Sequence, residues 1–390
     1  MRSVAITGLG IVSALGEGGP AHLEALRAGR SGLTKLTGFA AAGVPDSPVG
    51  EVAAAHLSQE DRTSRGEALA LAAARAALAG RPALEGHGVI AVGTTTGGIF
   101  ESEQHYLAHR GAEGAESREL LRHHPAGAVA DRLASRLALS GERHTFSTAC
   151  SSSANSIGYA AALVEAGAPW ALAGGMDTLC RLTYSGFYAL KLLSAAPCRP
   201  FDARRNGLSL GEGAAFLLLE PMDRARARGA RVLGRVAGWG TSSDAHHATA
   251  PHPEGKGAAA AMRAALADAG VAPREVDYVN AHGTATPAND KAEALALAAV
   301  FEGAMPPVSS TKGATGHTLG AAGAIEAVLS VLALEAGFAP ATVGLGEPDP
   351  ELPVRHVPAG GLTAPLAVAL SCSFGFGGNN AALVLTRGDR

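Results

Sequence analysis

The stretch Ser147-Thr148-Ala149-Cys150-Ser151-Ser152-Ser153 joins a short strand-like segment to an Ala-rich segment with helical character. A thiol at a strand-to-helix turn lies near the free N–H groups of the helix start. That position favours the thiolate, which is the nucleophilic form of cysteine. A free cysteine can also be a buried and inert core residue. The role of Cys150 therefore depends on what the rest of the chain places around it.

Segments with the pattern of strands alternate with Ala- and Leu-rich helical segments on both sides of this turn. The predicted strands cover residues 4–7, 89–93, 144–148, 171–175, 215–219, 232–239, 276–280, 308–310, 367–371 and 381–385. The clearest predicted helices cover residues 66–79, 151–166, 257–269, 290–300 and 319–334. Strands separated by helices predict an α/β fold with parallel sheets that are covered on both faces. Residues 89–96 and 276–284 each have the pattern of an apolar strand followed by a Gly/Thr loop. This similarity indicates a faint internal repeat.

Composition and charge narrow the class of protein. With 390 residues, 47% of them hydrophobic, the chain can bury a large core. The net charge of −3 argues against general binding to nucleic acid or to a membrane surface. Four widely spaced cysteines without a CxxC pair predict a reduced, cytoplasmic protein.

Two further observations bear on the membrane. The first residues enter a strand without an apolar leader, so we expect no signal peptide. The longest apolar run, residues 321–340, contains Glu326 and Glu335 and predicts a buried helix rather than a membrane span.

Two histidine motifs in the second half favour a functional role for Cys150. His282 ends a predicted strand within Asn280-Ala281-His282-Gly283-Thr284-Ala285-Thr286-Pro287, where a side chain tends to face a crevice. His317 precedes a predicted helix at the end of Ser310-Thr311-Lys312-Gly313-Ala314-Thr315-Gly316-His317. A helix start disfavours the imidazolium and favours a neutral ring that donates a hydrogen bond. Either histidine by itself is more often structural.

A glycine-rich turn completes the set of motifs. It reads Ser373-Phe374-Gly375-Phe376-Gly377-Gly378-Asn379-Asn380, and its exposed N–H groups are suited to hold an oxyanion. The four motifs, in this order, resemble those of the β-ketoacyl-acyl carrier protein synthases, and most of all the elongating KAS I/KAS II branch. The resemblance covers nearly the whole chain, from residues 4–10 to residues 380–385. The elongating branch has a Cys-His-His triad and the initiating branch Cys-His-Asn, so His317 favours elongation.

The resemblance implies the thiolase fold, with two similar βαβαβαββ halves stacked in five layers, α-β-α-β-α. We expect the halves at residues 1–222, with Cys150, and 223–390, with both histidines. The site would then lie at the interface of the halves. Family members are generally homodimers, so a homodimer is expected.

The resemblance also implies a role for each motif. Cys150 would take the acyl chain from a carrier protein as a thioester, with the N–H groups of Cys150 and Phe376 as the oxyanion hole. His282 and His317 would hold the thioester carbonyl of malonyl-carrier protein while carbon dioxide leaves. The enolate would then attack the thioester and lengthen the chain by two carbons.

Other residues are assigned supporting roles by the same resemblance. Lys312 and Glu326 would form a buried pair that orders the site, although a plain structural ion pair is the alternative. No metal and no redox or other cofactor is expected, because decarboxylation drives the reaction. The expected substrate-binding residues are Thr284, Thr286, Phe374, Phe376 and Thr96.

Two departures from the family pattern bear on the substrate. Asn379 replaces the usual Thr, and Thr96 occupies a loop position where larger apolar residues can limit chain length. A small polar Thr96 favours a longer, rigid or unsaturated chain, so a polyene or polyketide pathway is as consistent as fatty-acid synthesis. A partner subunit is an alternative source of residues that complete the pocket.

The carrier protein is acidic, so its docking surface should be basic. The candidate docking residues are Arg62, Arg65, Arg204 and Arg205, for each of which a solvated surface position is equally consistent.

A His-rich segment lies in the second half of the chain. Asp244, His246, His247 and His252 have ligand chemistry suited to a metal. The same segment, however, matches a family pattern that lines the pocket region, so no metal is predicted. Some relatives hold a monovalent cation near the site with Asn residues, where this chain has Ser371 and Cys372, so the resemblance does not assign a cation to this chain.

Three rival functions remain open. The chain could be the active ketosynthase subunit of a heterodimer with a chain-length-factor-like partner. It could instead be a non-catalytic acyl-binding partner, but those subunits typically lack the nucleophile that Cys150 provides. A degradative thiolase would use a second cysteine near the C-terminal Gly-rich loop, as Cys372 is, but the two-histidine pattern opposes it.

Overall fold

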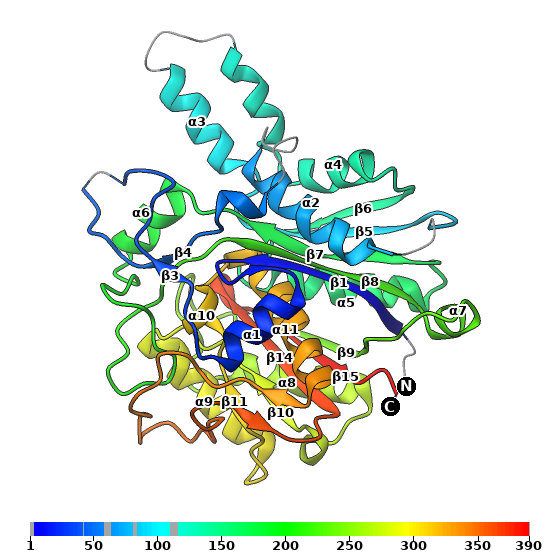
Figure 1. Ribbon diagram of the computed structural model, residues 1–390. Helices are drawn as coiled ribbons and strands as arrows, with labels where there is room; N and C mark the ends of the chain where they lie inside the picture. Colours follow the sequence, from blue (N-terminus) through cyan, green and yellow to red (C-terminus); the bar gives the residue numbers. More distant parts are fainter. Residues whose placement is uncertain (1–3, 42, 58–63, 81–83, 110–115, 390) are drawn as a thin grey trace.

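A computed structural model describes residues 4–41, 43–57, 64–80, 84–109 and 116–389 (Figure 1). In this part of the chain, a large mixed sheet and the helices on its faces form an α/β fold. The main strands of the first half are β1 (Val4–Ser13), β5 (Gly88–Gly93), β6 (Gly141–Phe146), β7 (Ala171–Asp177) and β8 (Gly213–Pro221). Those of the second half are β9 (Gly234–Ser243), β10 (Tyr278–Asn280), β11 (Val308–Ser309), β14 (Val368–Gly375) and β15 (Asn379–Thr386).

Both halves of the sheet have the same strand order. The first half runs β6-β5-β7-β8-β1 and the second β11-β10-β14-β15-β9. Counted in chain order within each half, both read third, second, fourth, fifth, first. The halves meet where β1 pairs with β9, from Val4↔Val236 to Ile6↔Gly234. The faint repeat in the sequence thus corresponds to β5 and β10, which are the second strands of the two halves.

The expectation of parallel sheets was only partly right. β5 pairs in parallel with β6 and β7, and β10 with β11 and β14, but β1, β8, β9 and β15 pair antiparallel with their neighbours. In the second half, β15 follows β14 after a short turn, which suits an antiparallel pair. In the first half, β8 pairs antiparallel with β7 although the helix Arg181–Ala189 lies between them in the chain. The sheet is therefore mixed.

Helices divide the molecule into five layers. α5 (Ser152–Glu165) and α11 (Ala322–Ala336) contact each other and lie between the two halves of the sheet (Figure 1). α2 (Arg65–Leu78) and α4 (Ala128–Arg136) cover the outer face of the first half. α8 (Lys256–Ala269) covers that of the second, with α9 (Pro287–Phe301) beside it. This is the α-β-α-β-α arrangement expected for a thiolase fold.

The two central helices are built from small and apolar residues. Gly323 of α11 faces α5 so closely that a Cβ there would lie 2.7 Å from the backbone N of Ala154. Residues 319–336 form the one stretch in the described ranges that is long and apolar enough to cross a membrane, and 83% of it is buried inside the fold. It is the core helix that the charges at Glu326 and Glu335 predicted.

All the predicted strands and helices occur, with shifted ends. β1 continues to Ser13, and the strand predicted at 144–148 lies at Gly141–Phe146. The described residues of the first half also form helices that had not been predicted. Besides α4, these are α1 (Gly19–Arg27), α3 (Ile99–His109) and α6 (Arg181–Ala189). α3 packs on η3 (Glu116–His123), and the two project from the body of the molecule (Figure 1). Helices α1, α3 and α6 are short, so each leaves little periodicity to detect in the sequence.

Candidate active site

Cys150 lies in a tight turn between β6 and α5. The preceding residue, Ala149, has φ 53°, which a residue with a Cβ rarely adopts. Two serines hold the turn, since Ser152 Oγ accepts from Thr148 N–H and Ser151 Oγ donates to the Thr148 carbonyl. The thiol therefore sits at a rigid bend at the start of a helix, with 6% of the residue exposed.

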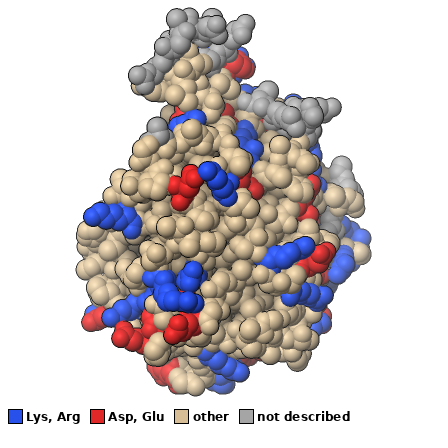
Figure 2. Space-filling view, turned by 60° about the vertical axis from the view of Figure 1, so that its left-hand side comes forward, with Lys and Arg blue, Asp and Glu red and all other residues tan. Residues whose placement is uncertain are grey.

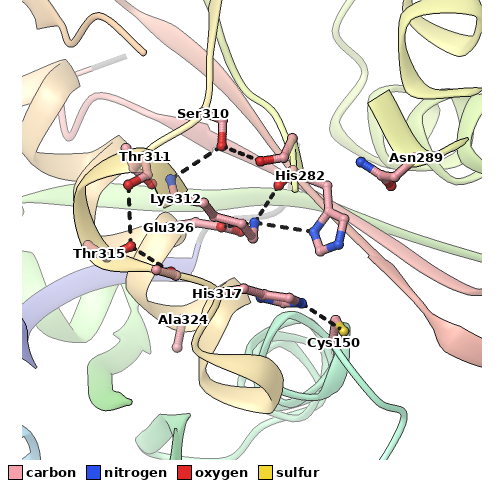
Figure 3. A network of polar contacts seen from close by, with 12 residues as sticks. Cys150, His282, Asn289, Ser310, Thr311, Lys312, Thr315, His317, Ala324 and Glu326 are labelled. Atoms are coloured by element: carbon pink, nitrogen blue, oxygen red, sulfur yellow. Dashed lines mark hydrogen bonds and ion pairs between the residues drawn. The ribbon is translucent and has the colours of Figure 1, made fainter. Parts of the chain in front are cut away.

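His317 approaches this thiol from the other half of the molecule. It follows the short helix α10 (Lys312–Thr315), and its backbone N–H donates to the Ser209 carbonyl at 2.8 Å. Its Nε2 lies 3.0 Å from Cys150 Sγ (Figure 3). Among the described residues, its Nδ1 has no hydrogen-bond partner. The ring is thus in direct contact with the thiol.

His282 stands beside His317 at the end of β10. The two ring centroids are 5.2 Å apart, edge to face. Its backbone N–H and that of Gly283 both donate to Glu293 at 2.7 Å. Lys312 Nζ lies 3.3 Å from His282 Nδ1, and an ammonium can only donate. His282 Nδ1 is therefore an acceptor, and the ring proton lies on Nε2.

Lys312 and Glu326 form a buried ion pair beside His282 (Figure 3). Lys312 Nζ donates to the Glu326 carboxylate and to the His282 carbonyl. Burial raises the pKa of Glu326 to about 7 against the opposing effect of the Lys312 charge. The pair thus fixes the loop and the ring of His282 through one ammonium group.

Burial and charge keep both imidazoles neutral. The pKa of His282 lies well below its usual value because of burial, the Lys312 charge and His317, in that order. Burial, followed by the Lys312 charge, likewise lowers the pKa of His317. These shifts agree with the expectation of neutral rings that donate hydrogen bonds.

The thiol differs from the expectation of an activated thiolate. Burial raises the pKa of Cys150 to about 12, although the Lys312 charge and a hydrogen bond from the Phe376 N–H lower it. The helix start was expected to stabilise the thiolate, but the loss of hydration outweighs that effect. In this state Cys150 is a thiol.

The glycine-rich turn brings Phe376 to the thiol. Its backbone N–H donates to the Cys150 sulfur, and its ring stacks on Phe187 at 5.5 Å. Gly375 permits this approach, because a Cβ there would lie 3.1 Å from Cys150 N. Asn379 Nδ2 donates to the Phe376 carbonyl at 3.0 Å, so the residue that departs from the family pattern braces the turn.

A cavity of about 330 Å³ opens in front of these groups. It is lined by Cys150, His282 and His317, and by apolar residues of the segment from Phe187 to Leu208. Four of the predicted substrate-binding residues also line it, namely Thr284, Thr286, Phe374 and Phe376. Lys312 and Glu326 lie behind the histidines and outside the lining.

Thr96 does not line this cavity. Its hydroxyl and backbone N–H donate to the buried carboxylate of Asp177 at 2.7 and 2.8 Å. A substrate contact at Thr96 therefore remains a prediction. Asp177 and Glu293 were missed in the sequence, because neither lies in one of the recognised motifs.

Strained backbone marks the site loops. Ala149 precedes Cys150, Ala285 (φ 68°) lies between the two threonines of the cavity, and Leu319 (φ 52°) follows His317 by two residues. Non-glycine residues in this conformation persist only where the surroundings hold them. The site loops are thus held in fixed conformations by the rest of the fold.

The other candidate sites do not assemble. In the described part of the chain, the one group of three or more His, Cys, Asp or Glu side chains with ligand atoms within 4.8 Å of one another is Cys150, His282 and His317. The segment with His246, His247 and His252 forms no such group. Cys372 is fully buried in β14 and absent from the cavity lining, which disfavours a thiolase-like second cysteine.

The predicted docking arginines need correction. Arg65 is bound to the buried Glu212, and Arg205 is 9% exposed and pairs with Asp349 at 2.5 Å, so neither is available to a carrier protein. Arg204 is exposed, and Arg62 lies outside the described residues. On the face shown in Figure 2, positive and negative side chains are mixed in small groups. This face has no extended basic area of the kind that binds nucleic acid.

Comparisons with known proteins agree with this geometry. Residues 1–225 match the family described as "Beta-ketoacyl synthase, N-terminal domain", and residues 233–346 match "Beta-ketoacyl synthase, C-terminal domain". The chain is 36% identical to "3-oxoacyl-[acyl-carrier-protein] synthase 2" of Rhizobium meliloti (strain 1021), over 99% of each protein.

Two solved structures are also similar to the chain. "The ishigamide ketosynthase/chain length factor" has a TM-score of 0.94 and 37% identity, over 99% of each chain. A type II PKS acyl-carrier protein in complex with its ketosynthase bound to the hexaketide has a TM-score of 0.90 and 29% identity, also over 99% of each chain.

Proposed function

The chain belongs to the β-ketoacyl synthase family, and we propose that it elongates a carrier-bound acyl chain by decarboxylative Claisen condensation. It is a condensing enzyme of the acyltransferase class. The observation that carries the proposal is the meeting of Cys150, His282, His317 and the Phe376 N–H in the lining of one cavity. These groups supply a nucleophile, two neutral donors and an oxyanion contact.

The first step is acyl transfer to Cys150. The sulfur attacks the thioester carbonyl of acyl-carrier protein, and the thiol proton passes to His317 Nε2, which lies 3.0 Å away. The N–H groups of Cys150 and Phe376 bind the oxyanion of the tetrahedral intermediate. Collapse of that intermediate breaks the bond to the carrier sulfur, which leaves as a thiol after taking up the proton. The acyl chain is then a thioester of Cys150.

The second step is condensation with malonyl-carrier protein. His282, and His317 as the tautomer with its proton on Nε2, donate to the malonyl thioester carbonyl, and the C–C bond to the carboxylate breaks with loss of carbon dioxide. The resulting enolate carbon attacks the acyl carbonyl on Cys150, the C–S bond to the enzyme breaks, and the released sulfur takes up a proton from water to restore the thiol. The product is a β-ketoacyl chain on the carrier protein, two carbons longer. Thr284 and Thr286 line the path and are suited to bind the pantetheine arm.

Elongation of a panel of acyl-carrier proteins with malonyl-carrier protein tests the proposal. The wild type should form the β-ketoacyl product, Cys150→Ala should form none, and Cys150→Ser should retain only a trace because a hydroxyl is a weaker nucleophile. Condensation by Cys150→Ala at the wild-type rate would contradict the mechanism. Product length across the panel would identify the acyl chain, whether from a fatty-acid or a polyene or polyketide pathway.

We also propose that the chain works as a dimer. We expect a homodimer, with a heterodimer of this chain and a chain-length-factor-like subunit as the second candidate. The similarity to a ketosynthase/chain length factor structure favours that candidate. The retained Cys150 makes this chain the catalytic subunit of such a pair, rather than a non-catalytic partner.

Light scattering of the protein expressed alone separates the two states. A stable, active species of about twice the mass of one chain supports the homodimer. An inactive protein that gains activity on co-expression with a related subunit supports the heterodimer. A fully active monomer would contradict both.

Lys191 is our candidate for docking the carrier protein. It is exposed and stands between Leu190 and Leu192, which both line the cavity. Lys191→Glu should raise the KM for acyl-carrier protein several-fold and leave a small acyl thioester substrate unaffected. Arg274→Glu is the matched control, since Arg274 is also exposed but neither of its chain neighbours lines the cavity. An equal effect of both reversals would show a general charge effect instead of docking.

We also propose a cytoplasmic location and a division into halves at residues 1–222 and 223–390. All four cysteines are free and buried, as suits a reducing compartment. Short helix α7 (Met222–Ala227) links β8 to β9 and contains the proposed boundary. A fluorescent fusion found outside the cytoplasm would contradict the location.

A further inference from the structure

Asp177 is a buried carboxylate that none of the proposed steps uses. It ends β7 and is fully buried. Its Oδ1 accepts from the Thr94 hydroxyl at 2.7 Å, and from the hydroxyl and N–H of Thr96 at 2.7 and 2.8 Å. The Thr95 N–H donates to both carboxylate oxygens. One carboxylate thus holds the whole 94–96 loop.

The same carboxylate reaches into the other half of the molecule. Its Oδ2 accepts from the Gly320 N–H at 2.6 Å. Gly320 lies three residues after His317 and next to Leu319, whose φ is 52°. A Cβ at position 320 would lie 2.7 Å from Asp177 Oδ2 and 2.7 Å from Thr95 N. The close approach therefore requires glycine, and the His317 turn is tied directly to Asp177.

The 94–96 loop in turn contacts the turn of the nucleophile. The Thr95 hydroxyl donates to the carbonyl of Ala149 at 3.2 Å. Ala149 has the left-handed conformation that orients Cys150. Asp177 is consequently connected to the Cys150 turn through Thr95 and to the His317 turn through Gly320. These two turns carry the two partners of the 3.0 Å contact between Cys150 Sγ and His317 Nε2.

We propose that Asp177 is a positioning residue that sets the distance between Cys150 Sγ and His317 Nε2. It does not line the cavity and touches no substrate path. Its carboxylate ties together two strained turns from different halves, so that the sulfur and the imidazole meet without reorganisation. The inference rests on the proposed function, because it concerns the geometry of the same reaction.

Thr95 allows a test that leaves the buried carboxylate in place. Thr95 is exposed, so Thr95→Val should fold normally while losing the hydrogen bond to Ala149. We expect kcat for condensation to fall about tenfold with little change in KM, because a misplaced reacting group slows the chemistry and not the binding. Thr95→Ser keeps the hydroxyl and should restore most of the rate. Thr37→Val is the matched control. It removes an exposed hydroxyl that donates to Glu51 at 2.7 Å, and neither residue lines the cavity.

Asp177→Asn tests the connection itself. The amide has an NH₂ donor in place of one of the two acceptor oxygens. Where this donor faces an N–H such as that of Gly320, no hydrogen bond can form. We expect kcat to fall about a hundredfold, with KM for the carrier protein within about twofold of the wild type. Circular dichroism and thermal unfolding would show which variants are folded. If Asp177→Asn fails to fold, the two Thr95 variants decide.

Alkylation of Cys150 by iodoacetamide at one fixed pH separates this inference from the proposed function, because it needs no condensation. Thr95→Val should be alkylated several-fold more slowly than the wild type, since a displaced sulfur loses the contacts with His317 Nε2 and the Phe376 N–H that stabilise its thiolate, and Thr95→Ser should match the wild type. Unchanged kcat and alkylation in folded Thr95→Val would overturn the inference. So would an equal loss in Thr95→Ser and Thr95→Val. A wild type without condensation, but with these alkylation differences, would contradict the proposed function alone.

Discussion

At the residue scale, Cys150 is controlled by groups that act against one another. Burial raises its pKa, while the Lys312 charge and the Phe376 N–H lower it. His317 Nε2 lies in contact with the sulfur and is the nearest group that can take the proton. The thiolate is therefore formed at the moment of attack and not stored in the resting enzyme.

This balance predicts the pH dependence of thiol modification. The pKa of Cys150 is raised to about 12, so below that value the thiolate fraction grows with pH. The iodoacetamide rate should rise roughly tenfold per pH unit between about pH 6 and about pH 9, without a plateau. Cys150→Ala provides the background from the other three cysteines. A rate that is constant across this range would instead indicate a stored thiolate.

Removing one partner of the buried Lys312–Glu326 pair should cause a large loss of stability. Lys312→Met leaves the Glu326 carboxylate buried without its partner and should lower the free energy of unfolding by about 3–5 kcal/mol. The double variant Lys312→Met/Glu326→Leu should recover most of that stability but not the activity, because the hydrogen bonds to His282 are lost. Urea unfolding and the condensation assay measure the two effects.

An exposed pair serves as the control for this prediction. Arg30 and Glu24 lie 3.0 Å apart with more than half of each side chain exposed. Arg30→Gln should change the free energy of unfolding by less than about 1 kcal/mol. Losses of equal size at both pairs would contradict a special role for burial.

At the element scale, the contact between α5 and α11 positions the nucleophile. α5 begins two residues after Cys150, and α11 begins five residues after His317. The helices meet where Gly323 faces Ala154, and Ser153 Oγ accepts from Ala324 N–H at 2.8 Å. The starts of two central helices thus bring the thiol and the imidazole together.

Gly323→Ala should disturb that contact. The added Cβ would lie 2.7 Å from Ala154 N and 2.8 Å from its Cβ, both in a rigid helix. We expect a loss of about 1–3 kcal/mol in the free energy of unfolding, together with a lower kcat. Gly186→Ala is the matched control, because a Cβ there meets nothing within 4 Å in helix α6. It should stabilise the protein by about 0.5–1 kcal/mol. Equal destabilisation of both variants would contradict the role of close helix contact.

At the scale of the whole molecule, the site exists only where the two halves meet. The first half supplies Cys150 and Asp177, and the second supplies His282, His317 and Phe376. The two halves share one strand order, and residues of both halves line the same cavity. Any change that shifts one half against the other should therefore lower kcat before it unfolds either half.

The motifs and the main elements could be read from the chain because they are local. A strand that ends in a small-residue turn and an Ala-rich helix is defined by neighbouring residues, as at residues 144–166. The same holds for the order of the four motifs, which indicated the family. Helices α3 and α6 could not be predicted in this way, because their positions depend on packing that short, weakly patterned segments do not encode.

The sequence by itself determined which groups are available: one thiol, two histidines, a lysine–glutamate pair and a glycine-rich turn. Only the tertiary structure decided their distances and charge states. Cys150 and His317 are 167 residues apart in the chain and 3.0 Å apart in space. The neutral rings, the protonated thiol and the carboxylate of Asp177 that links both turns all follow from burial between the two halves of the sheet. Burial and long-range hydrogen bonds are properties of the folded chain, and no local pattern of residues contains them.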